Sequence, residues 1–165
     1  MDKATISKYA KENGTPLLVF DHSQIRKNSA SFTRHIPRAK PYYAVKANSE
    51  PAIVRTMLEL GAGFDVASLQ EFKVLESILG QTTFEQKREF VSQRVIYAHT
   101  VKRQEHLQEM SAYSPRMTYD SEAEMLKIKQ HSPTARLVLR ISVPNAGSIV
   151  QLSNKFGIAP SEALP

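Results

Sequence analysis

The alternation of short apolar segments with helix-forming segments constrains the fold of this chain most. Five segments have the character of buried strands, and they are centred on Tyr43, Phe64, Ile96, Met117 and Leu139. Segments with apolar residues at helical spacing separate them. Strands that alternate with helices form βα units, whose strands pair in parallel. The sequence therefore predicts an α/β protein.

Two architectures satisfy this alternation, a doubly wound sheet and part of a (β/α)8 TIM-type barrel. A complete barrel needs about 250 residues, and this chain has 165. Five strands cannot close an eight-stranded cylinder. If the fold is a barrel, we expect it to be partial and truncated after about five barrel strands.

Local signals indicate where several elements begin and end. Residues 16–20, PLLVF, read as a short strand, and residues 23–36 read as a helix. The segment 40–48 reads as a strand, as does the longer segment 135–143. The polar stretch 81–93 has no clear structure and is longer than the turn expected there. The tail after residue 143 is loop-like.

Two helices carry recognisable end signals. Ser49 is the expected N-cap of a helix with Pro51 in its first turn and Gly61 after its last turn. Ser121 and Glu124 have the spacing of a capping box. These signals set the expected bounds of the two helices.

Composition excludes several classes of protein. The chain has no cysteine, so it has no disulfide, thiolate metal site or cysteine nucleophile, which fits a cytoplasmic location. Its net charge is +6, but the basic residues are scattered, so we expect no nucleic-acid partner. No apolar run approaches the roughly 18 residues that span a bilayer, and we expect neither a membrane span nor a metal site.

Polar residues stand at the ends of the expected strands. In both architectures, function collects at the carboxyl ends of parallel strands. The alternative is that strand ends are polar in any case and that Asp120–Ser121 is only a helix cap. The strand-end segments are Lys46–Asn48, Asp65–Ser68, His99–Thr100, Asp120–Ser121 and Arg140–Ser142.

Lys46 is the most unusual of these residues, because apolar or small residues stand on both sides of it. Loss of hydration lowers the pKa of a lysine, and a neutral amine can form a Schiff base with an aldehyde. The biological aldehyde that suits this arrangement is pyridoxal 5′-phosphate (PLP). A snorkelling lysine or an ion-paired lysine remain alternatives on periodicity alone.

Six sequence blocks carry a family resemblance. They are PYYAVKAN, GAGFDVAS, RVIYAH, TYDSEAEM, RLVLRI and LSNKFG, in this order between residues 41 and 157. Their order and spacing resemble the N-terminal part of the ornithine/diaminopimelate/arginine decarboxylase family. These are PLP-dependent enzymes with an alanine-racemase-like barrel. The last two blocks are more similar to ornithine decarboxylases than to diaminopimelate decarboxylases.

The resemblance implies roles for five residues. Lys46 resembles the lysine that binds PLP covalently, and Asp65 and Glu71 resemble the acidic residues behind it. Arg140 resembles the arginine near the phenolic oxygen of the cofactor, and Lys155 resembles a lysine at the interface of the family homodimer. The alternatives are a capping role for Asp65, a solvated helix position for Glu71 and a surface position for Arg140.

The resemblance also implies a reaction. The expected substrate is a basic amino acid, most simply ornithine, which would lose CO2 to give putrescine for polyamine biosynthesis. The alternative is a catalytically dead regulatory homologue that pairs with an intact decarboxylase.

The chain departs from the family pattern in several places. His99 and Thr100 stand where the family usually has Asn-Pro, and residues 81–93 read as an insertion. Residues 1–20 would pack with a C-terminal β-domain, and residues 21–165 would form an incomplete PLP-binding barrel domain. The rest of the barrel, with its phosphate-binding loop, would follow Pro165. We therefore expect the chain alone to be marginally stable, and soluble as an oligomer or with a partner.

Overall fold

The computed structural model describes residues 1–143 and 155–163. The chain divides into two compact units, Met1–Ala39 and Lys40–Pro165. The loop-like tail predicted after residue 143 lies mostly outside the described residues. The predicted domain boundary near residue 20 stays a prediction.

The first unit contains two helices, α1 (Lys3–Asn13) and α2 (His22–His35). Each begins at an aspartate whose carboxylate accepts backbone N–H groups of the first turn. Asp2 accepts from Thr5 at 2.8 Å, and Asp21 accepts from Ser23 at 2.9 Å. Helix α2 confirms the helix predicted over residues 23–36.

Residues 16–20 do not form the predicted strand. Leu18 is 78% exposed, and within the described residues no strand pairs with this segment. A strand needs a partner for its backbone N–H and C=O groups. The apolar composition of the segment was therefore insufficient to predict its conformation.

The second unit is built on a parallel sheet with the strand order β1-β2-β3-β4-β5. Consecutive strands are neighbours throughout, as they are in a barrel, whereas a doubly wound sheet reverses its order at a switch point. The structure therefore confirms the partial barrel. The strands are β1 (Tyr42–Ala44), β2 (Gly63–Val66), β3 (Val95–Tyr97), β4 (Arg116–Tyr119) and β5 (Arg136–Leu139).

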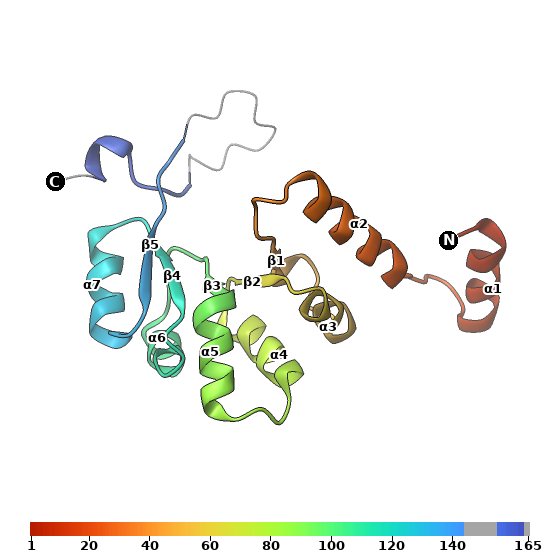
Figure 1. Cartoon of the computed structure of the whole chain (residues 1–165), viewed down its shortest axis with the longest axis horizontal. Helices are drawn as coiled ribbons and strands as arrows, with labels where there is room; N and C mark the ends of the chain where they lie inside the picture. Colours follow the sequence, from red (N-terminus) through yellow and green to blue (C-terminus); the bar gives the residue numbers. More distant parts are fainter. Residues whose placement is uncertain (144–154, 164–165) are drawn as a thin grey trace. The chain divides into compact units, whose positions relative to one another are not determined.

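Five helices follow the strands around one side of the sheet (Figure 1). Their apolar residues and those of the strands form one core, to which Phe72 of α4 and Leu107 of α6 contribute. The helices are α3 (Pro51–Glu59), α4 (Leu69–Leu79), α5 (Phe84–Arg94), α6 (Gln104–Ser111) and α7 (Glu122–His131). Short 3₁₀ helices are η1 (Val45–Ala47) and η3 (Pro160–Glu162).

The two faces of the sheet carry different kinds of side chain. Phe64 and Val66 of β2 are fully buried in the core with the helices. Side chains alternate along a strand, so Asp65 points to the opposite face. The face opposite the helices therefore carries the polar residues at the strand ends.

The prediction that Lys46 lies within a strand is wrong, because β1 ends at Ala44 and Lys46 belongs to η1. The turn is held by the hydroxyl of Tyr43, which donates to the carbonyl of Asn48 at 2.8 Å. The side chain of Asn48 in turn accepts the N–H of Glu50 at 2.9 Å. This side-chain-to-backbone bond completes a turn that strand propensity alone does not predict.

Helix α3 begins one residue later than its end signals suggested. Its N-cap is Glu50 rather than Ser49, and Pro51 is in the first turn as predicted. Gly61 follows the helix with φ 77°, a conformation that favours glycine. The predicted C-terminal end is therefore confirmed.

Most of the polar stretch 81–93, for which the sequence indicated no clear structure, forms helix α5; that it is an insertion stays a prediction. A capping box joins Thr83 and Gln86 at its start. Only Val91 of this helix is buried, which explains why hydrophobic periodicity did not reveal it. The spacing of Thr83 and Gln86 was the available signal.

Strand β5 is also shorter than the predicted segment 135–143.

Candidate active site

A cavity of about 290 Å³ lies at the carboxyl ends of β1, β2, β3 and β5. It brings together three of the predicted site residues, and it does not include Glu71 or Lys155. Its lining residues are Lys46, Asp65, Ala67, Ala98, His99, Thr100, Arg140 and Phe156.

Lys46 reaches this cavity from η1, directly after β1. Its neighbour Val45 is fully buried in the core, whereas Lys46 is exposed. The expectation of a dry lysine between apolar walls is therefore wrong in this structure. Val45 packs in the core with the helices, Ala47 is exposed, and Lys46 lines the cavity.

Asp65 is the acidic residue of the cavity. Its Oδ1 atom is buried and has no hydrogen-bond partner in the described part of the chain. Burial raises the pKa of Asp65, the positive charge of Lys46 lowers it, and the negative charge of Glu71 raises it. An unpartnered buried oxygen beside an amine is suited to a ligand that supplies a hydrogen-bond donor.

Glu71 lies behind the cavity wall instead of in it. Its Oε2 atom accepts the N–H of Ala67 at 3.0 Å, and its own N–H donates to Ser68 Oγ at 3.2 Å. Glu71 thereby stabilises the turn from β2 into α4, which is a capping arrangement and not a solvated helix position. Ala67, whose N–H Glu71 accepts, lines the cavity.

Arg140 packs against an aromatic residue that sequence reasoning did not select. Its guanidinium carbon lies 4.8 Å from the centre of the Phe156 ring, and the His99 ring meets the same ring edge-on at 6.2 Å. Phe156 reaches the cavity because Ile158 donates its N–H to the carbonyl of Arg140 at 2.9 Å. The LSNKFG block was the only sequence signal for Phe156.

Gly157 allows this close approach of the chain. Its φ is 98°, and a Cβ atom there would lie 2.6 Å from the backbone nitrogen of Ser142. Its N–H donates to Asp120 Oδ2 at 2.9 Å. A side chain at this position would therefore displace the segment that carries Phe156.

His99 and Thr100 form the wall contributed by the loop after β3. The Nδ1 atom of His99 accepts the N–H of Val101 at 3.0 Å, so the proton of a neutral ring is on Nε2. Thr100 is 1% exposed, and its hydroxyl has no partner in the described residues. The two positions at which the chain departs from the family pattern therefore both line the cavity.

The residues of the cavity fit a small anionic ligand that carries a carbonyl group. Lys46 offers an amine, Arg140 a permanent cation, and Asp65 and Thr100 offer unpartnered buried oxygen atoms. PLP combines an aldehyde with a negative charge and matches this set.

Within residues 1–143 and 155–163, no three or more His, Asp or Glu side chains are grouped so that they could hold a metal ion. No helix in these ranges is long and apolar enough to cross a membrane.

The partial barrel and its cavity define a cofactor-binding α/β domain, and sequence comparison identifies its family. Residues 22–165 match the pyridoxal binding domain of pyridoxal-dependent decarboxylases. The chain is 34% identical over 165 residues to lysine/ornithine decarboxylase of Selenomonas ruminantium, covering 99% of this chain and 39% of that protein. It is 33% identical over 147 residues to antizyme inhibitor 2 of Xenopus laevis, covering 88% of this chain and 30% of that protein.

A solved structure gives the same result. The structure of an SrLDC mutant in complex with PLP superposes with a TM-score of 0.86 at 32% identity, covering 99% of this chain and 40% of that one. The chain therefore belongs to the family of pyridoxal-dependent amino-acid decarboxylases, and PLP is the cofactor of its domain. It spans well under half the length of the relatives it matches.

Proposed function

We propose that the intact protein uses PLP to remove the carboxyl group of a basic amino acid, with ornithine as substrate and putrescine as product. The observation that carries this proposal is the convergence of Lys46, Asp65 and Arg140 on one cavity. The similarity to a lysine/ornithine decarboxylase supports the choice of substrate class. Such a reaction would belong to polyamine biosynthesis.

Each residue has a role that follows from its position. The amine of Lys46 would bind the aldehyde carbon of the cofactor, and Arg140 would stabilise a negatively charged oxygen of the ligand. Asp65 would accept a hydrogen bond at its unpartnered Oδ1, and Glu71 would keep the β2–α4 turn in place. Bound PLP supplies the electron sink for the carbanion that loss of CO2 leaves.

The proposal includes a homodimer in the cytoplasm. Lys155 is exposed in the structure and is available to a second subunit. The absence of cysteine suits a reducing compartment. The family resemblance of the LSNKFG block supports an interface at this residue.

Covalent trapping tests the proposal. The chain would be incubated with PLP and reduced with borohydride, and its peptides would be examined by mass spectrometry. A pyridoxyl group on Lys46 is expected, and it should be absent in Lys46→Ala. Lys40→Ala is the matched control, because Lys40 is an exposed lysine nearby that does not line the cavity. Labelling spread equally over surface lysines would refute the site.

A regulatory role is the second candidate. The similarity to antizyme inhibitor 2, a protein named as an inhibitor and not as an enzyme, favours it. In this case the chain would associate with an intact decarboxylase and alter its activity without turning over ornithine. Purified chain and a purified ornithine decarboxylase would be mixed at micromolar concentration and separated by size. Co-elution together with absence of Lys46 labelling would favour the regulatory role.

A further inference from the structure

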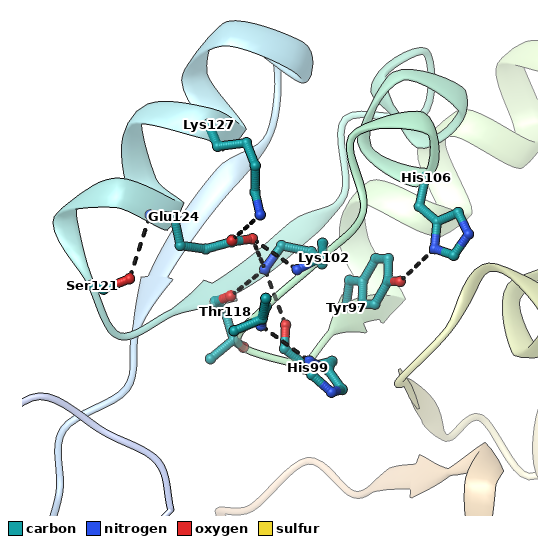
Figure 2. A network of polar contacts seen from close by, with 9 residues as sticks. Tyr97, His99, Lys102, His106, Thr118, Ser121, Glu124 and Lys127 are labelled. Atoms are coloured by element: carbon teal, nitrogen blue, oxygen red, sulfur yellow. Dashed lines mark hydrogen bonds and ion pairs between the residues drawn. The ribbon is translucent and has the colours of Figure 1, made fainter.

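Lys102 is a buried lysine outside the cavity lining, and its ammonium group is fully hydrogen-bonded (Figure 2). Its side chain has no exposed area. The Nζ atom lies 3.0 Å from Glu124 Oε1, 2.7 Å from the carbonyl of Thr118 and 3.0 Å from the carbonyl of His99. The three donors of the ammonium group thus have three acceptors on different parts of the chain.

Glu124 completes the network from helix α7. Its Oε1 atom also accepts the backbone N–H of Lys102 at 3.1 Å, and its Oε2 atom lies 2.5 Å from Lys127 Nζ. Ser121 Oγ accepts the N–H of Glu124 at 3.4 Å, as a capping box requires. The carboxylate, however, bonds Lys102 and not the backbone of Ser121. The predicted capping box is therefore only half formed, because the buried lysine takes the carboxylate.

This arrangement is costly, which suggests a role beyond stability. Burial lowers the pKa of Lys102, and the adjacent Glu124 opposes that shift. An apolar pair of similar size is often as stable as a buried ion pair or more stable. The network is better explained by the loop that it holds in place than by a gain in stability.

The network holds the loop between β3 and α6, which forms one wall of the cavity. Lys102 Nζ binds the carbonyl of His99, while the N–H of Val101 binds the His99 ring. Both the backbone carbonyl and the ring of His99 are therefore hydrogen-bonded. Through Thr118 and Glu124, the loop is also tied to β4 and α7.

We propose that Lys102 is a positioning residue that fixes the His99–Thr100 wall of the cavity and so sets the affinity of the cavity for PLP. The identity of the ligand rests on the proposed function. The effect on His99 itself does not, because it follows from contacts within the chain.

Two variants test this proposal. Lys102→Met removes the ammonium group but leaves the carboxylate of Glu124 buried with one partner fewer. The double variant K102M/E124Q leaves no unpaired buried charge, and the amide oxygen of residue 124 can still accept the backbone N–H of residue 102. Lys73→Met is the matched control, because Lys73 pairs with Glu109 at 3.0 Å on the surface, where both side chains are about half exposed.

The first measurement is the nitrogen spectrum of the His99 imidazole, assigned by comparison with His99→Asn. In the parent chain, we expect one tautomer with the proton on Nε2. In the double variant, we expect a mixture of tautomers, because the loop is no longer held at the His99 carbonyl. An unchanged His99 signal in the folded double variant would overturn the proposal.

The second measurement is PLP binding by absorbance titration, together with the melting temperature. We expect the double variant to melt close to the parent and to bind PLP about tenfold more weakly, because a displaced wall loses oriented contacts. Lys73→Met should match the parent in both. If the double variant regains both the melting temperature and the PLP affinity that Lys102→Met loses, the proposal is overturned. Failure of both variants to fold would also overturn it, because the ion pair would then be needed for stability.

The two measurements separate the two proposals. If the parent chain does not bind PLP, the cavity of this chain is not a PLP site by itself, and the His99 spectrum still decides whether Lys102 positions the His99–Thr100 wall. If the parent binds PLP and the double variant binds it equally well, the proposed function stands and the positioning role fails.

Discussion

The guanidinium of Arg140 lies 4.8 Å from the centre of the Phe156 ring, within the same cavity as Lys46. The aromatic ring covers the cation on one side and limits its contact with water. A partly covered cation binds an anionic group more strongly than a fully hydrated one. Under the proposed function, this contact would help Arg140 to bind a negatively charged oxygen of the ligand.

Replacement of Arg140 by methionine should weaken PLP binding about tenfold, which is the cost of one charge-assisted contact. Absorbance titration with PLP would measure the change. Arg136→Met is the control, because Arg136 is an exposed residue at the start of β5, the strand that Arg140 follows, and it does not line the cavity. Equal affinity in the two variants would argue against a role for Arg140.

Replacement of Asp65 by asparagine should raise the melting temperature at neutral pH by up to about 2 °C. Burial raises the pKa of Asp65, so folding favours its protonated form. The stability that this form contributes is fully present below the pKa that Asp65 has in the unfolded chain. It is lost as the pH rises through the higher pKa that Asp65 has in the folded chain. At neutral pH the ionised carboxylate opposes folding, and asparagine removes that cost.

The same variant should show a pH dependence with a defined sign. Its gain in melting temperature should shrink as the pH is lowered toward 3.8, the ordinary pKa of an aspartate, because the parent then carries a protonated Asp65. Thermal melts at several pH values would measure this trend. A gain that grows at acidic pH would contradict the assigned direction of the pKa shift.

Replacement of Gly157 by alanine should destabilise the segment that carries Phe156 by about 1–3 kcal/mol. The new Cβ would lie 2.6 Å from Ser142 N, at a φ of 98°. Denaturant unfolding would measure the loss. Gly61→Ala shares a positive φ of 77° but has nothing within 4 Å of its Cβ, so it should cost about 1 kcal/mol. Equal losses would show that the contact with Ser142 is unimportant.

Replacement of Thr83 by alanine should cost about 1 kcal/mol, which is typical of a lost N-cap. The hydroxyl of Thr83 accepts the N–H of Gln86 at 3.3 Å at the start of α5. Urea unfolding would measure the loss, with the neighbouring exposed Thr82→Ala as control. If the two variants unfold alike, the capping box does not stabilise α5.

Most of the element order could be predicted from the sequence. Helix α4 begins after a strand and ends at Gly80, as its periodicity and glycine indicate. Helix α5 was missed because it buries only Val91 and has little apolar periodicity. The segment 16–20 was overpredicted because apolar composition says nothing about whether a pairing strand exists.

The candidate site was predictable in part. Lys46, Asp65 and Arg140 stand at strand ends, and parallel pairing brings strand ends to one edge of the sheet. Phe156 and Lys102 were missed because their roles depend on contacts with residues elsewhere in the chain, such as Arg140 and Glu124.

The sequence by itself determined the alternation of strands and helices outside residues 16–20 and 81–93 and which polar residues stand near the strand ends, because these follow from local periodicity and end signals. Only the tertiary structure decided that Lys46 is exposed, that Phe156 covers Arg140 and that Glu124 bonds Lys102 instead of closing its capping box. Those outcomes depend on which distant groups compete for the same partner, and local sequence does not encode that competition.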